Sequence, residues 1–121
     1  MIACPGGAAT RGIVGAGVLR ALGPRGVLVN IARGSIVDEP ALVAALQDST
    51  IAAAGLDVFE GEPKLNPELL KCSNVVLTPH IGSATVPTRQ AMANLAADNL
   101  IGYLTQGKPL TPLNPEVTAR S

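Results

Sequence analysis

Apolar positions along this chain follow two different patterns. Short, nearly continuous runs rich in Val, Leu, Ile and Ala occupy residues 26–32, 51–59 and 74–78, and glycine, proline or charged residues follow each run. Runs of this length and composition are typical of buried strands of a parallel sheet. The pattern therefore predicts three strands.

The segments around these runs carry apolar residues at helical spacing instead. This spacing predicts helices at residues 14–22, 39–47 and 84–104, with a single helical turn at residues 67–70. Asp38 is placed to cap the second helix. Strands that alternate with connections of this length form parallel sheets through right-handed crossovers. The expected fold class is α/β, with half of a doubly wound parallel sheet followed by a long C-terminal helix.

Length and composition restrict this fold to one small unit. The chain has 121 residues, of which 47% are hydrophobic, yet it contains one Phe, one Tyr and no Trp. Its core must therefore be built from Ala, Val, Ile and Leu. We expect residues 1–105 to form one unit and residues 106–121, rich in Pro and Thr, to form a poorly ordered tail.

Charge and cysteine content exclude several classes of partner. Nine basic and nine acidic residues give a formal net charge of zero, without a long run of either sign, which argues against nucleic acid or a membrane surface as partner. The start of the chain lacks the features of a signal peptide, and no apolar stretch is long enough to span a bilayer. Cys4 and Cys72 fit no metal-ligand spacing, so we expect reduced thiols, a cytoplasmic protein and no metal site.

Residues capable of chemistry follow the predicted strands. Arg33 follows the first strand, Asp57, Glu60 and Glu62 lie at or beyond the end of the second, and His80, the only histidine, follows the third. Ligands of open parallel sheets bind at the carboxyl ends of the strands. A guanidinium can grip a carboxylate, and an imidazole oriented by a carboxylate can move a proton near neutral pH. The set predicts a site for an acid with a reactive carbonyl or hydroxyl, although an arginine or histidine at a strand end is more often only a solvated terminus.

Three longer motifs contain these residues. They are VNIARGSIVDE at 29–39, AGLDVFEGEP at 54–63 and LTPHIGSAT at 77–85. In order and spacing they resemble the arginine, acidic and histidine motifs of the D-isomer-specific 2-hydroxyacid dehydrogenases, a resemblance that extends from Cys4 to about Pro112. Within this family, the sequence of the chain most resembles the sequences of glyoxylate and hydroxypyruvate reductases. The resemblance implies a partial Rossmann-type sheet, namely the C-terminal half of the NAD(P)-binding domain.

The resemblance also implies a role for each residue. Arg33 would bind the substrate carboxylate, and His80, paired with Glu62, would act as general acid in reduction and as base in oxidation. Asp57 would face the nicotinamide carboxamide, and Glu60 would be a solvent-facing neighbour. The expected cofactor-binding residues are Cys4, Pro5, Ile31, Ala32, Arg33, Asp57, His80 and Gly82. The implied reaction transfers a hydride between NADH or NADPH and a small 2-oxo acid, such as glyoxylate or hydroxypyruvate, and yields the D-2-hydroxy acid.

At Cys4, a packed thiol remains the simpler interpretation than a cofactor contact, and at Cys72 the expectation is a loop or strand-edge residue without chemical importance.

Parts of such an enzyme are not found in these 121 residues. The run GAGVLR at 15–20 has two glycines of a dinucleotide fingerprint but lacks the third glycine, a preceding strand and a ribose-binding acid about 20 residues on. We expect the true fingerprint upstream of Met1, so that the isolated chain binds cofactor weakly and turns over slowly or not at all. Two alternatives remain open, an inactive truncated product and a nucleotide-binding or interaction module without catalysis.

The predicted half sheet also has consequences for assembly. An unpaired apolar strand edge, at residues 26–32 or on the neighbouring strand, invites pairing with a second copy of the chain or with a missing partner. We therefore expect self-association, most simply a homodimer. Sedimentation over a range of concentrations measures this, and a monomer at every concentration would contradict it.

Overall fold

The structure is a computed structural model that describes residues 1–114. It divides into two compact units, Met1–Gly82 and a second unit that begins at Ser83, and each is described here by itself. The first unit contains all the predicted strands. The part of the predicted tail beyond residue 114 lies outside the described residues.

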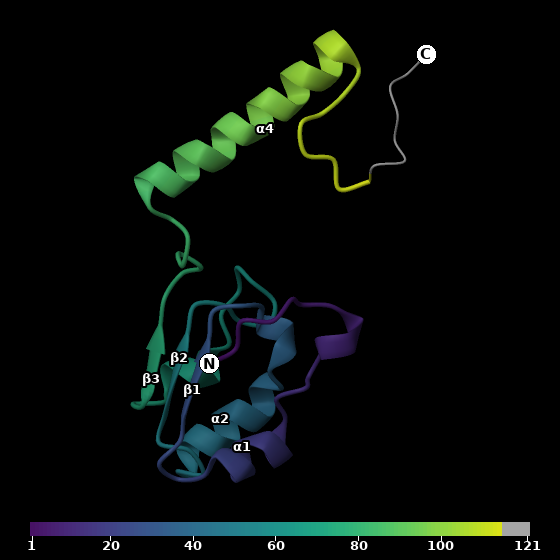
Figure 1. Ribbon diagram of the computed structural model, residues 1–121. Coiled ribbons are helices and arrows are strands. Elements are labelled where there is room, and N and C mark those ends of the chain that lie inside the picture. The colour runs from purple at the N-terminus through teal and green to yellow at the C-terminus, as the bar shows by residue number, and fades with distance from the viewer. Residues whose placement is uncertain (115–121) are drawn as a thin grey trace. The chain divides into compact units, whose positions relative to one another are not determined.

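Three parallel strands form the sheet of the first unit (Figure 1). They are β1 (Val27–Asn30), β2 (Ala53–Leu56) and β3 (Val75–Leu77), in the order β1-β2-β3. Near the start of the chain, Ile2 forms a parallel bridge to Asn30. The predicted α/β class and the three strands are confirmed. Each strand is shorter than its apolar run, because the last residues of the run already belong to the loop at the sheet edge.

Helices connect and follow these strands. The elements are η1 (Ala8–Thr10), α1 (Ala16–Leu22), η2 (Gly34–Ile36), α2 (Glu39–Gln47), α3 (Pro67–Leu70) and α4 (Val86–Gln106). The limits of α2 are as predicted, and the Asp38 carboxylate caps it by accepting the Ala41 N–H at 3.1 Å. The prediction that the first helix begins at Val14 is wrong, since Val14 forms a parallel bridge to Val37 instead.

The second unit is dominated by α4, the predicted long helix. Thr85 caps its start, where its hydroxyl accepts the Thr88 N–H, and Pro87 lies in the first turn, where a missing N–H costs nothing. Gly107, with φ of 67°, ends the helix in the left-handed conformation that glycine adopts readily. Among the described residues, no helix is long and apolar enough to cross a membrane.

The core of the first unit lies between the sheet and one layer of helices. Figure 1 shows α1 and α2 on the same face of the strands. The side chains buried there are mainly aliphatic: Leu19, Leu28, Val37, Leu42, Val43, Ala45, Leu46, Ile51, Ala54, Leu56 and Leu69. Full burial of one such Leu or Ile stabilises the fold by about 1.5–3 kcal/mol.

The opposite face of the sheet is open within the described residues. Val27, Ile31 and Val76 are 54%, 50% and 69% exposed. Strands of a parallel sheet are usually covered on both faces. The expectation of fully buried strands is therefore wrong for the chain as described, although the apolar residues that would suit a second covering layer are present. Self-association stays a prediction.

Candidate functional site

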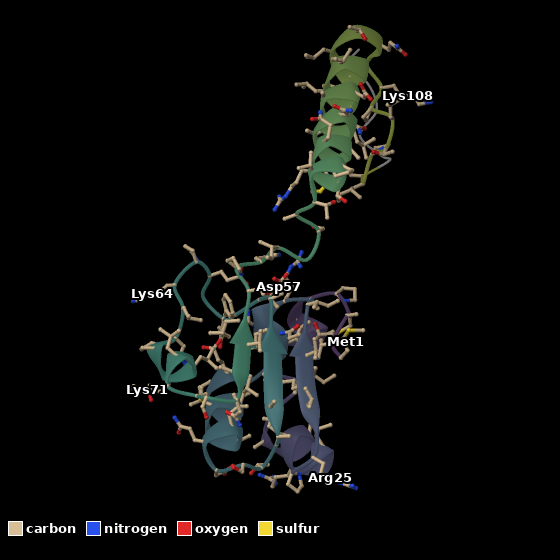
Figure 2. The ribbon with its side chains drawn as sticks, turned by 90° about the vertical axis from the view of Figure 1, so that its left-hand side faces the viewer. Met1, Arg25, Asp57, Lys64, Lys71 and Lys108 are labelled. Carbon is tan, nitrogen blue, oxygen red and sulfur yellow. The ribbon has the colours of Figure 1, made fainter. Side chains whose placement is uncertain are left out.

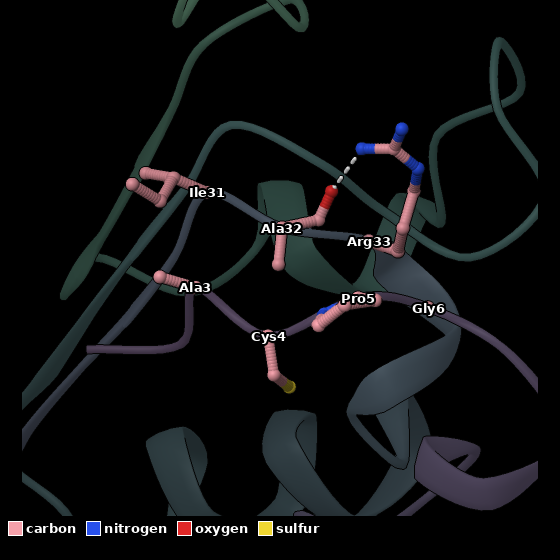
Figure 3. Close-up of a pocket in the computed structure, with 7 residues that line it drawn as sticks. All are labelled: Ala3, Cys4, Pro5, Gly6, Ile31, Ala32 and Arg33. Carbon is pink, nitrogen blue, oxygen red and sulfur yellow. Dashed lines mark hydrogen bonds between the residues drawn. The ribbon is translucent and has the colours of Figure 1, made fainter. Parts of the chain in front are cut away.

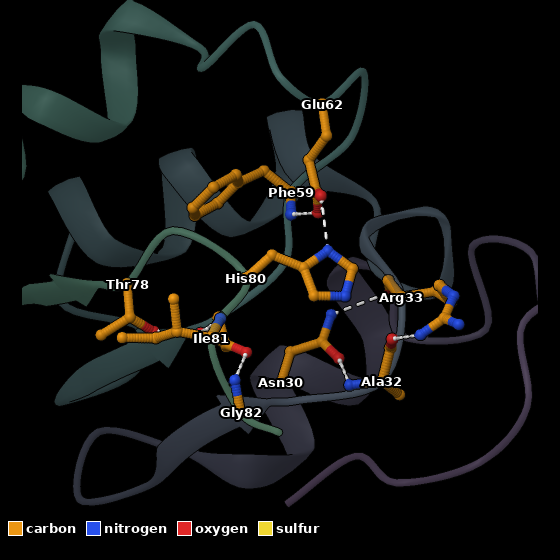
Figure 4. Close-up of polar contacts among 10 residues, drawn as sticks. Asn30, Ala32, Arg33, Phe59, Glu62, Thr78, His80, Ile81 and Gly82 are labelled. Atoms are coloured by element: carbon orange, nitrogen blue, oxygen red, sulfur yellow. Dashed lines mark hydrogen bonds and ion pairs between the residues drawn. The ribbon is translucent and has the colours of Figure 1, made fainter. Parts of the chain in front are cut away.

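Two open hollows lie at the carboxyl edge of the sheet. The loops that follow the three strands line one of them, and residues 3–6 with the loop after β1 line the other. The first, called the histidine hollow below, has a volume of about 450 Å³. Its lining consists of Arg11, Arg33, Gly34, Ser35, Phe59, Glu60, Gly61, Glu62 and His80. Three loops that are distant in sequence thus bring Arg33, Glu62 and His80, the three residues predicted to be catalytic, around one space (Figure 4).

Arg33 also borders a second hollow, called the Cys4 hollow below. It has a volume of about 480 Å³ and is lined by Ala3, Cys4, Pro5, Gly6, Ile31, Ala32 and Arg33 (Figure 3). Five predicted cofactor-binding residues therefore lie together here. Cys4 carries a free and exposed thiol, so the interpretation of a packed thiol is wrong. Cys72 is a partly buried free thiol beside α3, away from both hollows.

A carboxylate and an imidazole form the central pair of the histidine hollow. Glu62 Oε2 lies 2.7 Å from His80 Nδ1, and Glu62 Oε1 accepts the Phe59 N–H at 2.9 Å (Figure 4). Partial burial raises the pKa of Glu62, but the hydrogen bonds from His80 and Phe59 and the charge of His80 together bring it below its usual value. Glu62 is therefore ionised at neutral pH. It orients the ring through Nδ1, and Nε2 has no partner among the described residues.

The backbone at His80 adopts an uncommon conformation. His80 has φ of 54°, in the left-handed region that residues other than glycine rarely occupy. Such a conformation costs on the order of 1–3 kcal/mol and persists where the surroundings enforce it. Here the preceding Pro79 ends the strand, and the His80 N–H donates to the Thr78 carbonyl at 3.0 Å. The tight turn presents the imidazole at the sheet edge.

Asp57 enforces this turn from the neighbouring strand. Its Oδ1 accepts the Thr78 hydroxyl and the Ile81 N–H at 2.9 Å, and its Oδ2 accepts the Gly82 N–H at 2.8 Å. The Thr78 hydroxyl first, and then the Ile81 N–H, lower the pKa of Asp57 below its usual value. Figure 2 shows Asp57 at the end of the sheet from which these loops emerge. The sequence predicted a cofactor contact but not this loop-holding role, although Thr78 directly after a strand was an available signal.

Asn30 shapes the loop that carries Arg33, and sequence reasoning missed it. Its side chain is 1% exposed, its Oδ1 accepts the Ala32 N–H at 3.0 Å, and its Nδ2 donates to the Arg33 carbonyl at 2.9 Å. The signal was a polar residue inside an apolar run, which a buried strand tolerates only when its amide is fully bonded. Arg33 itself uses one guanidinium N–H on the Ala32 carbonyl at 2.6 Å, so other donors remain for an anion.

Two glycines allow the loops to approach one another. A Cβ on Gly34 would overlap the carbonyl group of Phe59 and the nitrogen of Glu60, so only glycine fits between the arginine loop and the acidic loop. A Cβ on Gly6 would lie 2.7 Å from the Arg33 Cγ, in the space that the arginine side chain occupies. Glu60, as expected, faces outward, where it forms a 3.6 Å ion pair with Arg11.

These features define a class of protein. A parallel α/β sheet of Rossmann type carries an arginine and a carboxylate–histidine pair at its carboxyl edge. A family model described as the NAD binding domain of D-isomer specific 2-hydroxyacid dehydrogenases matches residues 1–82. The chain belongs to the D-isomer specific 2-hydroxyacid dehydrogenase family.

Named relatives agree with this assignment. The chain is 52% identical over 113 residues to 2-ketogluconate reductase of Gluconobacter oxydans, with 93% of this chain and 36% of the relative covered. It is 56% identical over 99 residues to glyoxylate reductase of Pyrococcus furiosus, with 82% and 30% covered. The chain thus spans about a third of the length of the curated relatives it matches.

A solved structure shows the same architecture. It is the NADPH-dependent glyoxylate/hydroxypyruvate reductase of Sinorhizobium meliloti in complex with NADP and malonate, with a TM-score of 0.90 and 53% sequence identity. The match covers 98% of this chain and 37% of that protein. The expected Rossmann-type fold with a long C-terminal helix is thereby confirmed.

Proposed function

We propose that this chain contributes the nicotinamide side of the active site of an oxidoreductase that reduces a small 2-oxo acid to the D-2-hydroxy acid with NADH or NADPH. The observation that carries the proposal is the 2.7 Å contact between Glu62 and His80, whose ring faces the same hollow as Arg33. A cation for a carboxylate and a proton-transfer pair are the groups that this reaction requires. The names of the relatives support glyoxylate or hydroxypyruvate as substrate.

Each polar residue then has a distinct task. The Arg33 guanidinium grips the substrate carboxylate and thereby orients the carbonyl. His80 donates a proton from Nε2 to the carbonyl oxygen during reduction and removes it during oxidation. Glu62 holds the ring through Nδ1 and places a carboxylate beside it, as the partner of a catalytic histidine does.

The Cys4 hollow and its neighbours suit a nicotinamide cofactor. Backbone around Cys4, Pro5, Ile31 and Ala32 surrounds an open space at the carboxyl edge. Asp57 Oδ2 accepts one hydrogen bond, from Gly82, and so keeps capacity to accept a carboxamide N–H. In this proposal the bound cofactor supplies the hydride. Arg33, His80 and Gly82 complete its surroundings.

The proposal also covers the assembly, the location and the partners of the protein. The chain works as part of a homodimer in the cytoplasm, with a small acid as its substrate and without nucleic acid or membrane. The balanced charge of the sequence supports the exclusion of nucleic acid and membrane as partners. Residues 1–105 would contribute to the cofactor domain and the helix leading out of it, and residues 106–121 would form the tail.

Complementation in a relative tests the proposed activity. Residues 1–114 would replace the corresponding segment of the Sinorhizobium meliloti reductase, which is 53% identical to this chain, and oxidation of NADH and NADPH would be followed with glyoxylate and hydroxypyruvate. The isolated chain would be assayed in parallel. We expect turnover in the hybrid and a kcat reduced about 10²- to 10⁴-fold by His80→Ala, since general acid catalysis contributes that much.

Glu68→Gln provides the matched control, because Glu68 is a carboxylate paired with Lys71 outside both hollows. This variant should retain the kcat of the hybrid. A folded hybrid that binds NADPH without turnover would refute the proposed activity and favour the nucleotide-binding module. Equal activity of the His80→Ala hybrid would refute the role of the histidine.

A further inference from the structure

One buried carboxylate has no part in the proposed chemistry. Glu39, the first residue of α2, is only 7% exposed, and its Oε2 accepts the N–H of Glu60, 21 residues later in the chain, at 3.0 Å. Burial of a carboxylate is costly unless hydrogen bonds compensate it. Glu39 is therefore not simply a solvated residue at the start of a helix, and its buried position requires another explanation.

The group that Glu39 binds lies next to the central pair of the site. The Glu60 N–H belongs to the Phe59–Glu60 peptide, and the N–H of Phe59 itself donates to Glu62 Oε1 at 2.9 Å. The other oxygen of Glu62 contacts His80. Glu39 is thus linked to the imidazole of His80 through the hydrogen bonds to the Glu60 N–H, from the Phe59 N–H and between Glu62 and His80. The backbone of Phe59 and Glu60 connects the first two of these bonds.

The same peptide is held from a second side. Gly34 lies so close to the Phe59 carbonyl and the Glu60 nitrogen that no Cβ fits there. With Gly34 against it and the Glu39 carboxylate bonded to it, the acidic loop has little freedom at this point. Both holding residues lie on the segment that follows Arg33, so this segment couples the arginine loop to the acidic loop.

A purely helical role for Glu39 makes a different prediction. An acidic residue in the first turn of a helix interacts favourably with the helix dipole. Asp38, the cap of the same helix, accepts the Ala41 N–H at 3.1 Å, and among the described residues its side chain forms no hydrogen bond or ion pair with the acidic loop. If Glu39 only stabilised the helix, replacement of Glu39 and replacement of Asp38 would have the same effect on the Glu62–His80 pair.

We infer that Glu39 is a positioning residue, which holds the Phe59–Glu60 peptide so that the Glu62 carboxylate meets His80 in the correct orientation. The catalytic meaning of this inference rests on the proposed function. The positioning itself is a property of the chain without substrate or cofactor, and it can be measured even if turnover is absent.

Carboxyl-carbon NMR titration of the unliganded chain tests the inference. In Glu39→Ala we expect the pKa of Glu62 to rise toward the usual value of a glutamate, because the hydrogen bonds from His80 and Phe59 that lower it are loosened. Glu39→Gln should keep the low value, since its amide oxygen can still accept the Glu60 N–H. Asp38→Ala should lower the urea midpoint of unfolding, as loss of a cap does, without moving the pKa of Glu62.

Two results would overturn the inference. One is an unchanged pKa of Glu62 in Glu39→Ala, and the other is an equal rise in Asp38→Ala. Should Glu39→Ala fail to fold, the wild-type chain still tests the hydrogen bond on which the inference rests. The amide proton of Glu60 must shift with pH in step with the carboxyl carbon of Glu39, and an amide that does not follow this carbon contradicts the inference. Failure of the hybrid to turn over would bear on the proposed function alone.

Discussion

Replacement of Gly34 by alanine is expected to lower the free energy of unfolding by at least about 3 kcal/mol, because overpacking in a rigid environment costs roughly 1–3 kcal/mol and here the obstacle is backbone. The added methyl would overlap the Phe59 carbonyl and the Glu60 nitrogen. Relief requires the arginine loop and the acidic loop to separate. For a domain with a typical stability of about 5–15 kcal/mol, this is a large fraction of the total.

Urea unfolding followed by circular dichroism measures this effect, and Gly17→Ala is the matched control. Gly17 lies inside α1, and a Cβ there meets nothing within 4 Å. Alanine should stabilise that variant by roughly 0.4–1 kcal/mol, since it reduces the entropy of the unfolded chain and favours helix. If Gly34→Ala were as stable as wild type, the close approach of the two loops would be incorrect.

Replacement of Asn30 by alanine is expected to cost about 2–5 kcal/mol and to release Arg33 from its position. The amide of Asn30 bonds the Ala32 N–H and the Arg33 carbonyl, both at the end of β1. Its loss would leave the buried Ala32 N–H and the part-buried Arg33 carbonyl without these partners, and a fully buried group left without a partner costs about 1–3 kcal/mol. The released loop would then no longer present the guanidinium to the histidine hollow.

The measurement combines urea unfolding with the NMR signal of the Arg33 Nε–H group. Asn74→Ala serves as control, because the Asn74 amide likewise bonds two backbone groups, the carbonyls of Leu46 and Ala52, but at the opposite end of the sheet. Both variants should lose stability, and only Asn30→Ala should move the Arg33 signal. An Arg33 signal that stays in place in Asn30→Ala would show that the loop holds its shape without the amide.

Local patterns were sufficient to predict the strands and the α-helices, but not the short helices η1 and η2. Helix α2 has the predicted limits because capping by Asp38 and the apolar spacing after it are properties of adjacent residues. The start of α1 was misplaced, because the backbone of Val14 bonds to residues near Val37 that are distant in sequence. An interaction of that kind leaves no periodic trace in the sequence.

The candidate site likewise has features that the sequence predicted and features that it did not predict. Arg33, Glu62 and His80 were predicted because each occurs in a motif at the end of a strand, and parallel strands bring their carboxyl ends to one edge. Their roles remain proposals. The exposure of Cys4 was not predicted, since its solvent contact depends on how residues 3–6 pass the loop after β1.

By itself, then, the sequence determined the α/β class and the family resemblance and predicted that Arg33, Glu62 and His80 lie at one edge of the sheet, because these depend on residue type and on spacing along the chain. Tertiary structure alone decided which groups hold those residues in place. Asn30 binds the arginine loop, Asp57 the histidine turn and Glu39 the acidic loop. Each of these contacts is a hydrogen bond between a side chain and a backbone group, and backbone groups are the same at every residue. Their partners can therefore be identified only once the loops are placed in space.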